Sequence, residues 1–199
     1  MAAFVVGVAS SIVAWMVVAA QFVPRIEVSA LNEQPDSTKP SGVRYRVKVR
    51  NRSRVWRVGD VSLHVRVIVV GWNEDHPTSR TSLIVPVADA FPALERRPLR
   101  GWSKDHDEER SYTLHLNELH GGGLHRLPAF VTTQAREDTL TMTRLLGTGR
   151  TDAFVRIAVA ATHGVSGLRR TYTQKVRAGE IQFGDFQQGT VQIVPPSAT

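Results

Sequence analysis

The sequence offers one candidate for acyl-transfer chemistry. His120 is followed by three glycines, a pattern that forms the oxyanion hole of some esterases. Those enzymes also place their nucleophile in a Gly-x-Ser-x-Gly turn between a strand and a helix. Ser166 lies instead in Gly-Val-Ser-Gly-Leu, and the chain lacks the alternation of strands and helices of that fold. We therefore interpret residues 120–123 as a glycine-rich loop and expect no catalytic residues.

Metal binding is the second chemistry that the residue types allow. His115, His120 and His125 are close enough in sequence to meet, and residues 105–109 hold four acidic side chains. Neither group has the ligand spacing of a zinc motif or the glycine and regular oxygen ligands of a calcium loop. The chain has no cysteine, which excludes thiolate metal sites, disulfides and cysteine nucleophiles. We expect no metal site, no cofactor and no enzymatic activity.

The most distinctive charged feature is a basic face on a predicted strand. In residues 43–50, Val-Arg-Tyr-Arg-Val-Lys-Val-Arg, apolar and basic residues alternate, which predicts a strand with one buried and one solvated face. The chain carries a net charge of +7, and the window 25–57 holds nine basic and three acidic residues, a local excess of six. The positive charge is therefore concentrated at one place in the sequence.

This basic window follows an apolar segment, so its partner could be an anionic membrane surface. We predict lipid contact by five residues: Arg25, Arg44, Arg46, Lys48 and Arg50. A merely solvated strand face is the alternative. Nucleic acid is disfavoured, because Tyr45 and Trp56 are the few aromatic residues nearby that could stack on bases.

The apolar segment predicts a transmembrane helix over residues 1–24. Residues 2–23 contain no charge, and at about 1.5 Å per residue they would span about 33 Å, enough for a hydrocarbon core of about 30 Å. A cleaved signal peptide is the alternative, because residues 18–20 are small, although a basic stretch at the N-terminus is missing. Since the basic residues follow the helix, the positive-inside rule predicts a cytoplasmic domain and an external N-terminus.

The remainder predicts one β domain over residues 25–194 and a loose tail at 195–199. Strands are expected at 43–50, 61–70, 82–87, 110–116, 154–161, 168–176 and 190–194, with a turn at 164–167. About seven short strands favour an immunoglobulin-like antiparallel β-sandwich. We expect a weak helix near 136–146, a polar loop at 32–42 and a long charged loop at 88–109.

Three segments carry a resemblance to a known family. Residues 45–53 with 60–66, the hairpin at 154–173, and Glu-Ile-Gln-Phe-Gly-Asp-Phe at 180–186 resemble, in this order, the cytoplasmic domain of inward-rectifier potassium channels. The resemblance implies an immunoglobulin-like domain in the cytoplasm, regulated by acidic phospholipids that bind basic residues near the membrane. This chain has no second apolar helix and no selectivity-filter sequence, so we expect no pore from it alone.

These observations predict a membrane-anchored, non-enzymatic β-sandwich that acts as an interaction or regulatory module. The expected partners are membrane lipid, a protein partner or a second copy of the chain. One alternative is an extracytoplasmic domain that binds a ligand or an envelope partner. Another is an accessory subunit of a membrane complex, in which Gly7 and neighbouring small residues let helices pack closely.

Overall fold

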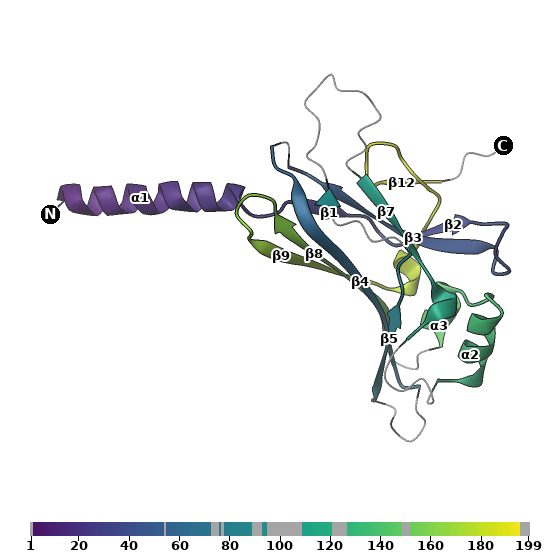
Figure 1. Cartoon of the computed structure of the whole chain (residues 1–199). Coiled ribbons are helices and arrows are strands. Elements are labelled where there is room, and N and C mark those ends of the chain that lie inside the picture. The colour runs from purple at the N-terminus through teal and green to yellow at the C-terminus, as the bar shows by residue number, and fades with distance from the viewer. Residues whose placement is uncertain are drawn as a thin grey trace.

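The structure is a helix joined to the end of a β-rich domain. The computed structural model describes residues 2–53, 55–72, 76, 78–88, 93–94, 109–120, 127–148 and 152–195. In Figure 1, α1 (Ala2–Gln21) projects away from the domain at one end. The prediction of an N-terminal helix followed by a mainly β domain is confirmed. Among the described residues, no helix combines the length and the apolar character needed to cross a membrane. The membrane-spanning role of residues 1–24 stays a prediction.

The first sheet is built around one long strand. β1 and β2 pair in succession along one edge of β3, β7 pairs along its other edge, and all three are antiparallel to it. β10 extends the sheet by a parallel pairing with β2. The strands are β1 (Ile26–Val28), β2 (Asn32–Pro35), β3 (Val43–Asn51), β7 (Glu109–Leu114) and β10 (Gln182–Phe183).

The second sheet is antiparallel throughout and has the order β5-β4-β8-β9. A short strand, β6, pairs with the beginning of β4. The strands are β4 (Val58–Val70), β5 (Arg80–Val85), β6 (Ala93–Leu94), β8 (Ala153–His163) and β9 (Arg169–Val176). Because β9 is the last strand in this order, it forms an edge of the sheet.

Small elements complete the domain. β11 (Asp185–Phe186) and β12 (Ile193–Val194) form a C-terminal hairpin. Gly184, just before it, has a φ of 146°, and a Cβ there would lie 2.0 Å from the Val194 carbonyl oxygen, so only glycine fits. The helices are α2 (Ala129–Arg136), α3 (Met142–Gly147) and the 3₁₀ turns η1 (Leu116–Glu118) and η3 (Ala178–Glu180).

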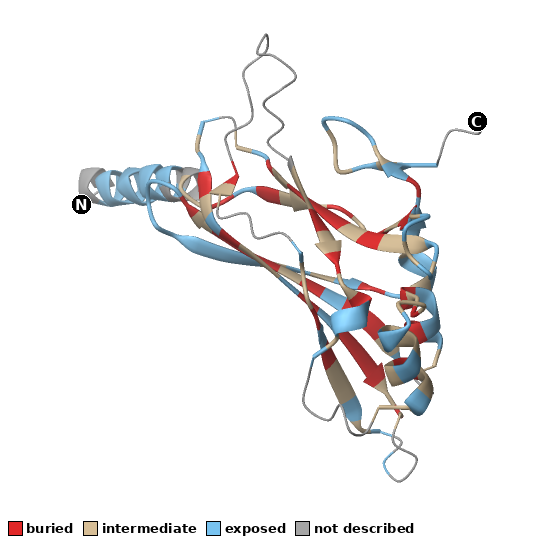
Figure 2. Ribbon diagram, turned by 45° about the vertical axis from the view of Figure 1, so that its right-hand side comes forward, coloured by how far each residue is buried: buried red, intermediate tan, exposed pale blue. Residues whose placement is uncertain are grey.

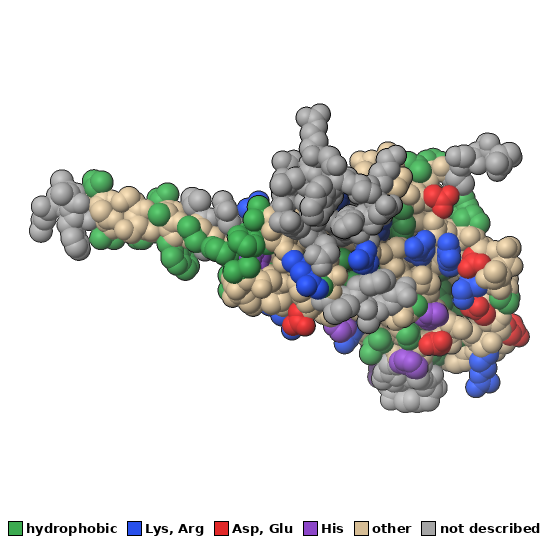
Figure 3. Space-filling model, turned by 45° about the horizontal axis from the view of Figure 1, so that its top comes forward, with side chains coloured by type: hydrophobic (Ala, Val, Ile, Leu, Met, Phe, Trp, Pro, Cys, Tyr) green, Lys and Arg blue, Asp and Glu red, His purple; other side chains and the backbone are tan. Residues whose placement is uncertain are grey.

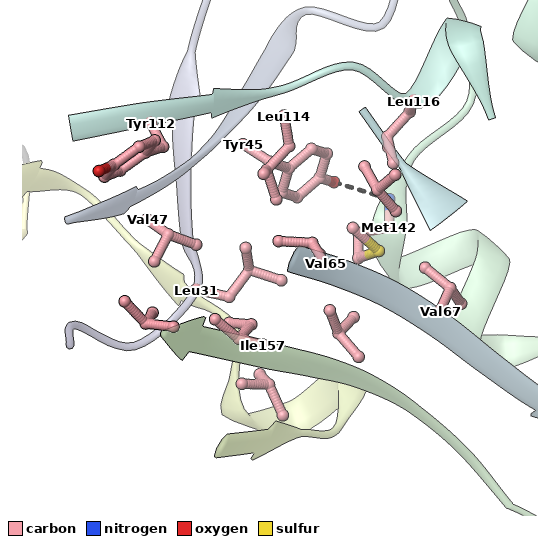
Figure 4. Close-up of a cluster of buried hydrophobic side chains, with 14 of the residues drawn as sticks. Leu31, Tyr45, Val47, Val65, Val67, Tyr112, Leu114, Leu116, Met142 and Ile157 are labelled. Carbon is pink, nitrogen blue, oxygen red and sulfur yellow. Dashed lines mark hydrogen bonds between the residues drawn. The ribbon is translucent and has the colours of Figure 1, made fainter. Parts of the chain in front are cut away.

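The two sheets share one hydrophobic core. Alternate residues of β3 (Tyr45, Val47, Val49) face alternate residues of the second sheet, and α3 closes one side with Met142 and Leu145. Figure 2 shows the buried residues concentrated between the sheets, and Figure 4 shows this cluster in detail. The Tyr45 hydroxyl donates to Glu33 Oε2 at 2.7 Å and accepts from the Met142 backbone N–H at 2.9 Å. It therefore joins β2, β3 and the first residue of α3.

Most of the predicted strands are present, and the differences have local causes. β3, β4, β5, β7, β8 and β9 match the predicted strands, and the turn at 164–167 joins β8 to β9. The predicted loop at 32–42 is wrong at its start, because the polar β2 is held by pairing with β3. The strand β1 was not expected, and the one at 190–194 is only two residues long. Within 88–109, the described part contains β6 and the first residue of β7; residues 89–92 and 95–108 lie outside the described part.

The single helix expected near 136–146 is two helices. Asp138 has a φ of 53°, which α-helical backbone does not adopt, and it ends the first segment after α2. Thr141 then caps α3 by accepting from the Arg144 N–H at 3.3 Å. Asp138 also pairs with Lys39 Nζ at 3.0 Å, which ties this connection to the turn between β2 and β3.

Candidate functional site: the junction of helix and domain

The predicted basic face on β3 is not a solvated face. Lys48 is only 6% exposed, so the prediction of a solvated face is wrong at this residue. The Phe186 ring covers the face, with its centroid 5.4 Å from Lys48 Nζ and 5.9 Å from the Arg46 guanidinium carbon. The Gln187 carbonyl accepts from Lys48 Nζ at 3.4 Å. Alternation identified the strand and its two faces, but it could not show that a hairpin more than a hundred residues away packs on the polar one.

The five predicted lipid-contact residues are spread along the domain. Arg25 directly follows the α1 segment, and the Arg25 carbonyl accepts from the Arg52 N–H at 2.7 Å. Arg50 lies beside it on β3, between Glu27 of β1 and Glu109 of β7 in the pairing register. Arg44 is six residues further along β3, about 20 Å away at 3.3–3.4 Å per residue. A surface at the end of α1 can therefore meet Arg25 and Arg50, whereas Arg44 lies toward the opposite end.

The turn between β2 and β3 marks that opposite end. There, hydrogen bonds from Thr38, with a contribution from nearby Arg44, lower the pKa of Asp36. Arg44 is thus close enough to Asp36 of this turn to act on its carboxylate. Contact of the five residues with lipid stays a prediction.

A cluster of aromatic rings connects α1 to the domain. Phe22 lies just past the helix, with its ring centroid 6.0 Å from that of Trp56 and 5.6 Å from that of His163. The His163 and Trp56 rings are 5.7 Å apart. The three residues come from the helix end, the segment before β4 and the end of β8. Their mutual contacts join the end of α1 to the domain.

Two hydrogen bonds reinforce this connection at the point where the helix ends. Ser166 Oγ, in the turn between β8 and β9, donates to the Phe22 carbonyl at 2.8 Å. The Tyr172 hydroxyl donates to the Pro24 carbonyl. Gly164 donates its N–H to the Arg57 carbonyl, and a Cβ at this glycine would lie 2.8 Å from that oxygen. The carbonyl groups that follow α1 are therefore held by the domain.

His163 is the buried polar group of the junction. Its side chain is 2% exposed, and burial lowers its pKa. Nδ1 accepts from the N–H groups of Val165 and Ser166 at 3.3 and 3.2 Å, which requires the neutral tautomer with hydrogen on Nε2. Nε2 has no hydrogen-bond partner among the described residues. The neutral ring therefore serves as a cap for the turn and as a packing surface for Phe22.

The contact between Ser166 Oγ and His163 Nδ1, at 3.2 Å, resembles the contact between a nucleophile and its base. The surroundings differ from a catalytic site. Nδ1 is already occupied by two backbone N–H groups, and Ser166 Oγ is directed to the Phe22 carbonyl. Within the described residues no group of three or more metal-ligating side chains comes together. Residues 105–108, 121–123 and His125, which the sequence singled out, lie outside the described part.

The junction also carries an exposed apolar surface. Val55, Val165 and Leu168 are 59%, 63% and 48% exposed, and they flank the contacts of Trp56 and Ser166 with Phe22. Figure 3 shows hydrophobic side chains continuing from α1 onto the adjoining end of the domain. Exposed basic residues surround this surface: Arg25, Arg52, Arg57 and Arg169. We call these apolar and basic residues together the junction platform.

The sequence predicts the separate segments of the junction platform, but not that they come together. The turn at 164–167 was predicted, and Trp56 was noted only as an aromatic residue near the basic strand. The contacts of Phe22 with Trp56 and His163 join positions 34 and 141 residues apart, which local patterns do not report. Comparison with protein-family models and with curated proteins gives no match for this chain.

Proposed function

We propose that the protein is a membrane-tethered, non-enzymatic interaction module, anchored by α1 and seated on the bilayer through the junction platform. The observation that carries this proposal is the set of large apolar side chains that α1 exposes. They are 44–71% exposed and lie round more than half of the helix circumference: Val5, Val6, Val8, Ile12, Val13, Trp15, Met16 and Val18. A helix that is apolar on most sides and projects from its domain needs a non-aqueous environment.

The crossing of the bilayer rests on the sequence of the whole segment. In α1 the structure describes the side chains of residues 5–16 and 18. A helix that crosses a bilayer needs about 20 apolar residues, so the prediction of a crossing depends on the sequence of the whole segment. Residues 2–23 carry no charge, and the basic residues follow at 25 and beyond. This arrangement supports a cytoplasmic domain with the N-terminus outside.

The platform has the composition of a surface that rests at lipid headgroups. Trp56 and the exposed apolar residues suit the interface between water and hydrocarbon, while the surrounding arginines suit anionic headgroups. The contacts of Phe22 and the hydrogen bonds of Ser166 and Tyr172 would place this end of the domain at the membrane. The resemblance to the lipid-regulated domain of inward-rectifier channels stays a prediction that agrees with this role.

Hydrogen exchange of the full chain reconstituted in bilayers tests the seating. We expect the amides of residues 164–168 to exchange several-fold more slowly in bilayers containing phosphatidylglycerol than in pure phosphatidylcholine, because each basic residue near the surface contributes about 1 kcal/mol. The double variant Arg52→Glu with Arg169→Glu should lose this difference.

A matched control carries the same change of charge elsewhere. Arg80→Glu with Arg136→Glu alters exposed residues of β5 and α2, away from α1 in Figure 1. This variant should keep the difference between the two lipids. Equal exchange in both lipids for the unaltered chain would show that the platform does not rest on anionic headgroups.

A further inference from the structure

We propose that the free edge of β9 is a docking site for an extended acidic segment of a partner protein, which adds to the second sheet as one more strand. This inference names the partner class of the interaction module and rests on that proposed function. Three properties of β9 carry it: an unpaired edge, a basic composition and an adjacent pocket.

Among the residues that the structure describes, no strand covers the outer edge of β9. β9 pairs with β8 from Arg169 to Val176. Figure 2 shows most of β9 exposed. Alternate N–H and C=O groups of an edge strand point outward, so an extended peptide can continue the hydrogen-bonding ladder. A run of eight residues gives such a peptide several main-chain hydrogen bonds.

The charge of β9 selects the kind of peptide. The strand contains Arg169, Arg170 and Lys175 and no acidic residue. Lys175 lies opposite Arg156 in the ladder, and Arg156 lies opposite Arg66 of β4, so three exposed cations stand side by side across three strands. No ion pair joins them to an acidic residue in the described part of the chain. Like charges placed directly opposite are unfavourable, and an acidic strand would relieve this.

The same charges oppose self-association through β9. A two-fold antiparallel pairing of two β9 strands, centred on Tyr172, would place Arg169 of each copy opposite Lys175 of the other. Basic residues on an edge strand commonly prevent such pairing. The favoured occupant is therefore a different, acidic segment.

A pocket beside the edge provides a position for an apolar side chain. It is lined by Ile26 and Val28 of β1, Ile157 of β8, and Tyr172, Thr173 and Gln174 of β9. A strand added to β9 would direct every second side chain toward this side of the sheet. The recognised segment should thus combine apolar residues at its centre with acidic residues at both ends.

A designed peptide serves as the probe. The labelled sequence Thr-Glu-Val-Thr-Val-Thr-Glu-Glu, antiparallel to β9, places glutamates opposite Lys175, Arg170 and Arg169, and valines opposite Gln174 and Tyr172. Its binding to the full chain in neutral detergent micelles is followed by fluorescence anisotropy. We expect it to bind about tenfold more tightly than the same peptide with lysines in place of glutamates, because the exchange replaces three attractive charge pairs by three repulsive ones.

Two further comparisons make the test specific. Arg170→Glu with Lys175→Glu should reverse the preference toward the lysine peptide, whereas Arg80→Glu with Arg136→Glu should leave it unchanged. In the added strand, the N–H groups of alternate residues point toward β9, and the others point away. N-methylation of the residues whose N–H groups point toward β9 should abolish binding. N-methylation of the other residues should leave binding unchanged. Equal binding of the glutamate and lysine peptides would overturn the proposal. Binding that survives N-methylation of both sets of residues, each tested separately, would overturn it too. Anionic lipid takes no part in this assay, so its failure would leave the membrane seating untouched.

Discussion

Replacing Ile12 and Val13 of α1 with aspartate should release the protein from membranes. Each replacement exchanges a favourable apolar residue for a charge near the middle of the segment, a change of about 3–4 kcal/mol on the insertion scale. Two replacements amount to about 6–8 kcal/mol, enough to reverse the partition of the helix. The measurement is the fraction of expressed protein that stays in the membrane pellet after alkaline carbonate extraction.

The controls separate insertion from folding. Ile12 and Val13 are 54% and 59% exposed, so the domain does not depend on their side chains. The doubly aspartate-substituted chain should therefore unfold at the same temperature as the unaltered one. A variant with leucine at both positions should stay in the pellet. Retention of the aspartate variant would mean that the apolar surface of α1 is covered by something other than lipid.

Replacing Tyr45 with phenylalanine should lower the stability of the domain, because the Tyr45 hydroxyl makes two hydrogen bonds. Burial, and then the hydrogen bond to the Glu33 carboxylate, raise the pKa of Tyr45, so its hydroxyl stays protonated and donates. Without that hydroxyl, the Met142 N–H loses its acceptor in a buried site. An unsatisfied buried donor costs about 1–3 kcal/mol, which corresponds to a decrease in melting temperature of about 2–12 °C for a domain of this size.

Tyr172→Phe is the matched control for this prediction. Its hydroxyl also donates one hydrogen bond, but to the Pro24 carbonyl at the half-buried junction. We expect a decrease of less than about 1 kcal/mol, since water can replace a partner at such a site. Thermal unfolding followed by circular dichroism compares the two variants. Equal losses would show that the link between β2, β3 and α3 is not the stabilising contact that the geometry indicates.

The alternation of apolar and polar residues was sufficient to predict most of the strands, but not to predict which segments pack on them. Alternation in β3, β4 and β8 is strong because one face of each lies in the core, and these strands were predicted close to their true ends. β2 was missed because its buried residues are polar: Asn32 is 0% and Gln34 5% exposed, so tertiary pairing overrides a loop-like sequence. The immunoglobulin-like strand order stays a prediction.

The candidate site depended on long-range contacts. The basic face of β3 was the strongest signal in the sequence, yet Phe186 packs on it, and only the Arg25 and Arg50 end lies near α1. The junction platform has no local signature, since Phe22, Trp56 and His163 belong to three separate segments. The sequence indicates the chemical character of each segment, whereas the fold determines which segments come into contact.

The depth of a spin label at position 165 tests the central claim, that the junction platform rests on the bilayer, most directly. The chain has no cysteine, so Val165→Cys gives one labelled site, and Thr38→Cys in the β2–β3 turn provides a reference at the opposite end of the domain. In reconstituted bilayers with phosphatidylglycerol, we expect the label at 165 to collide preferentially with oxygen, as a group at headgroup depth does, and the label at 38 to collide with a water-soluble nickel complex. If both labels report water alone, the platform does not contact the membrane and the account is wrong.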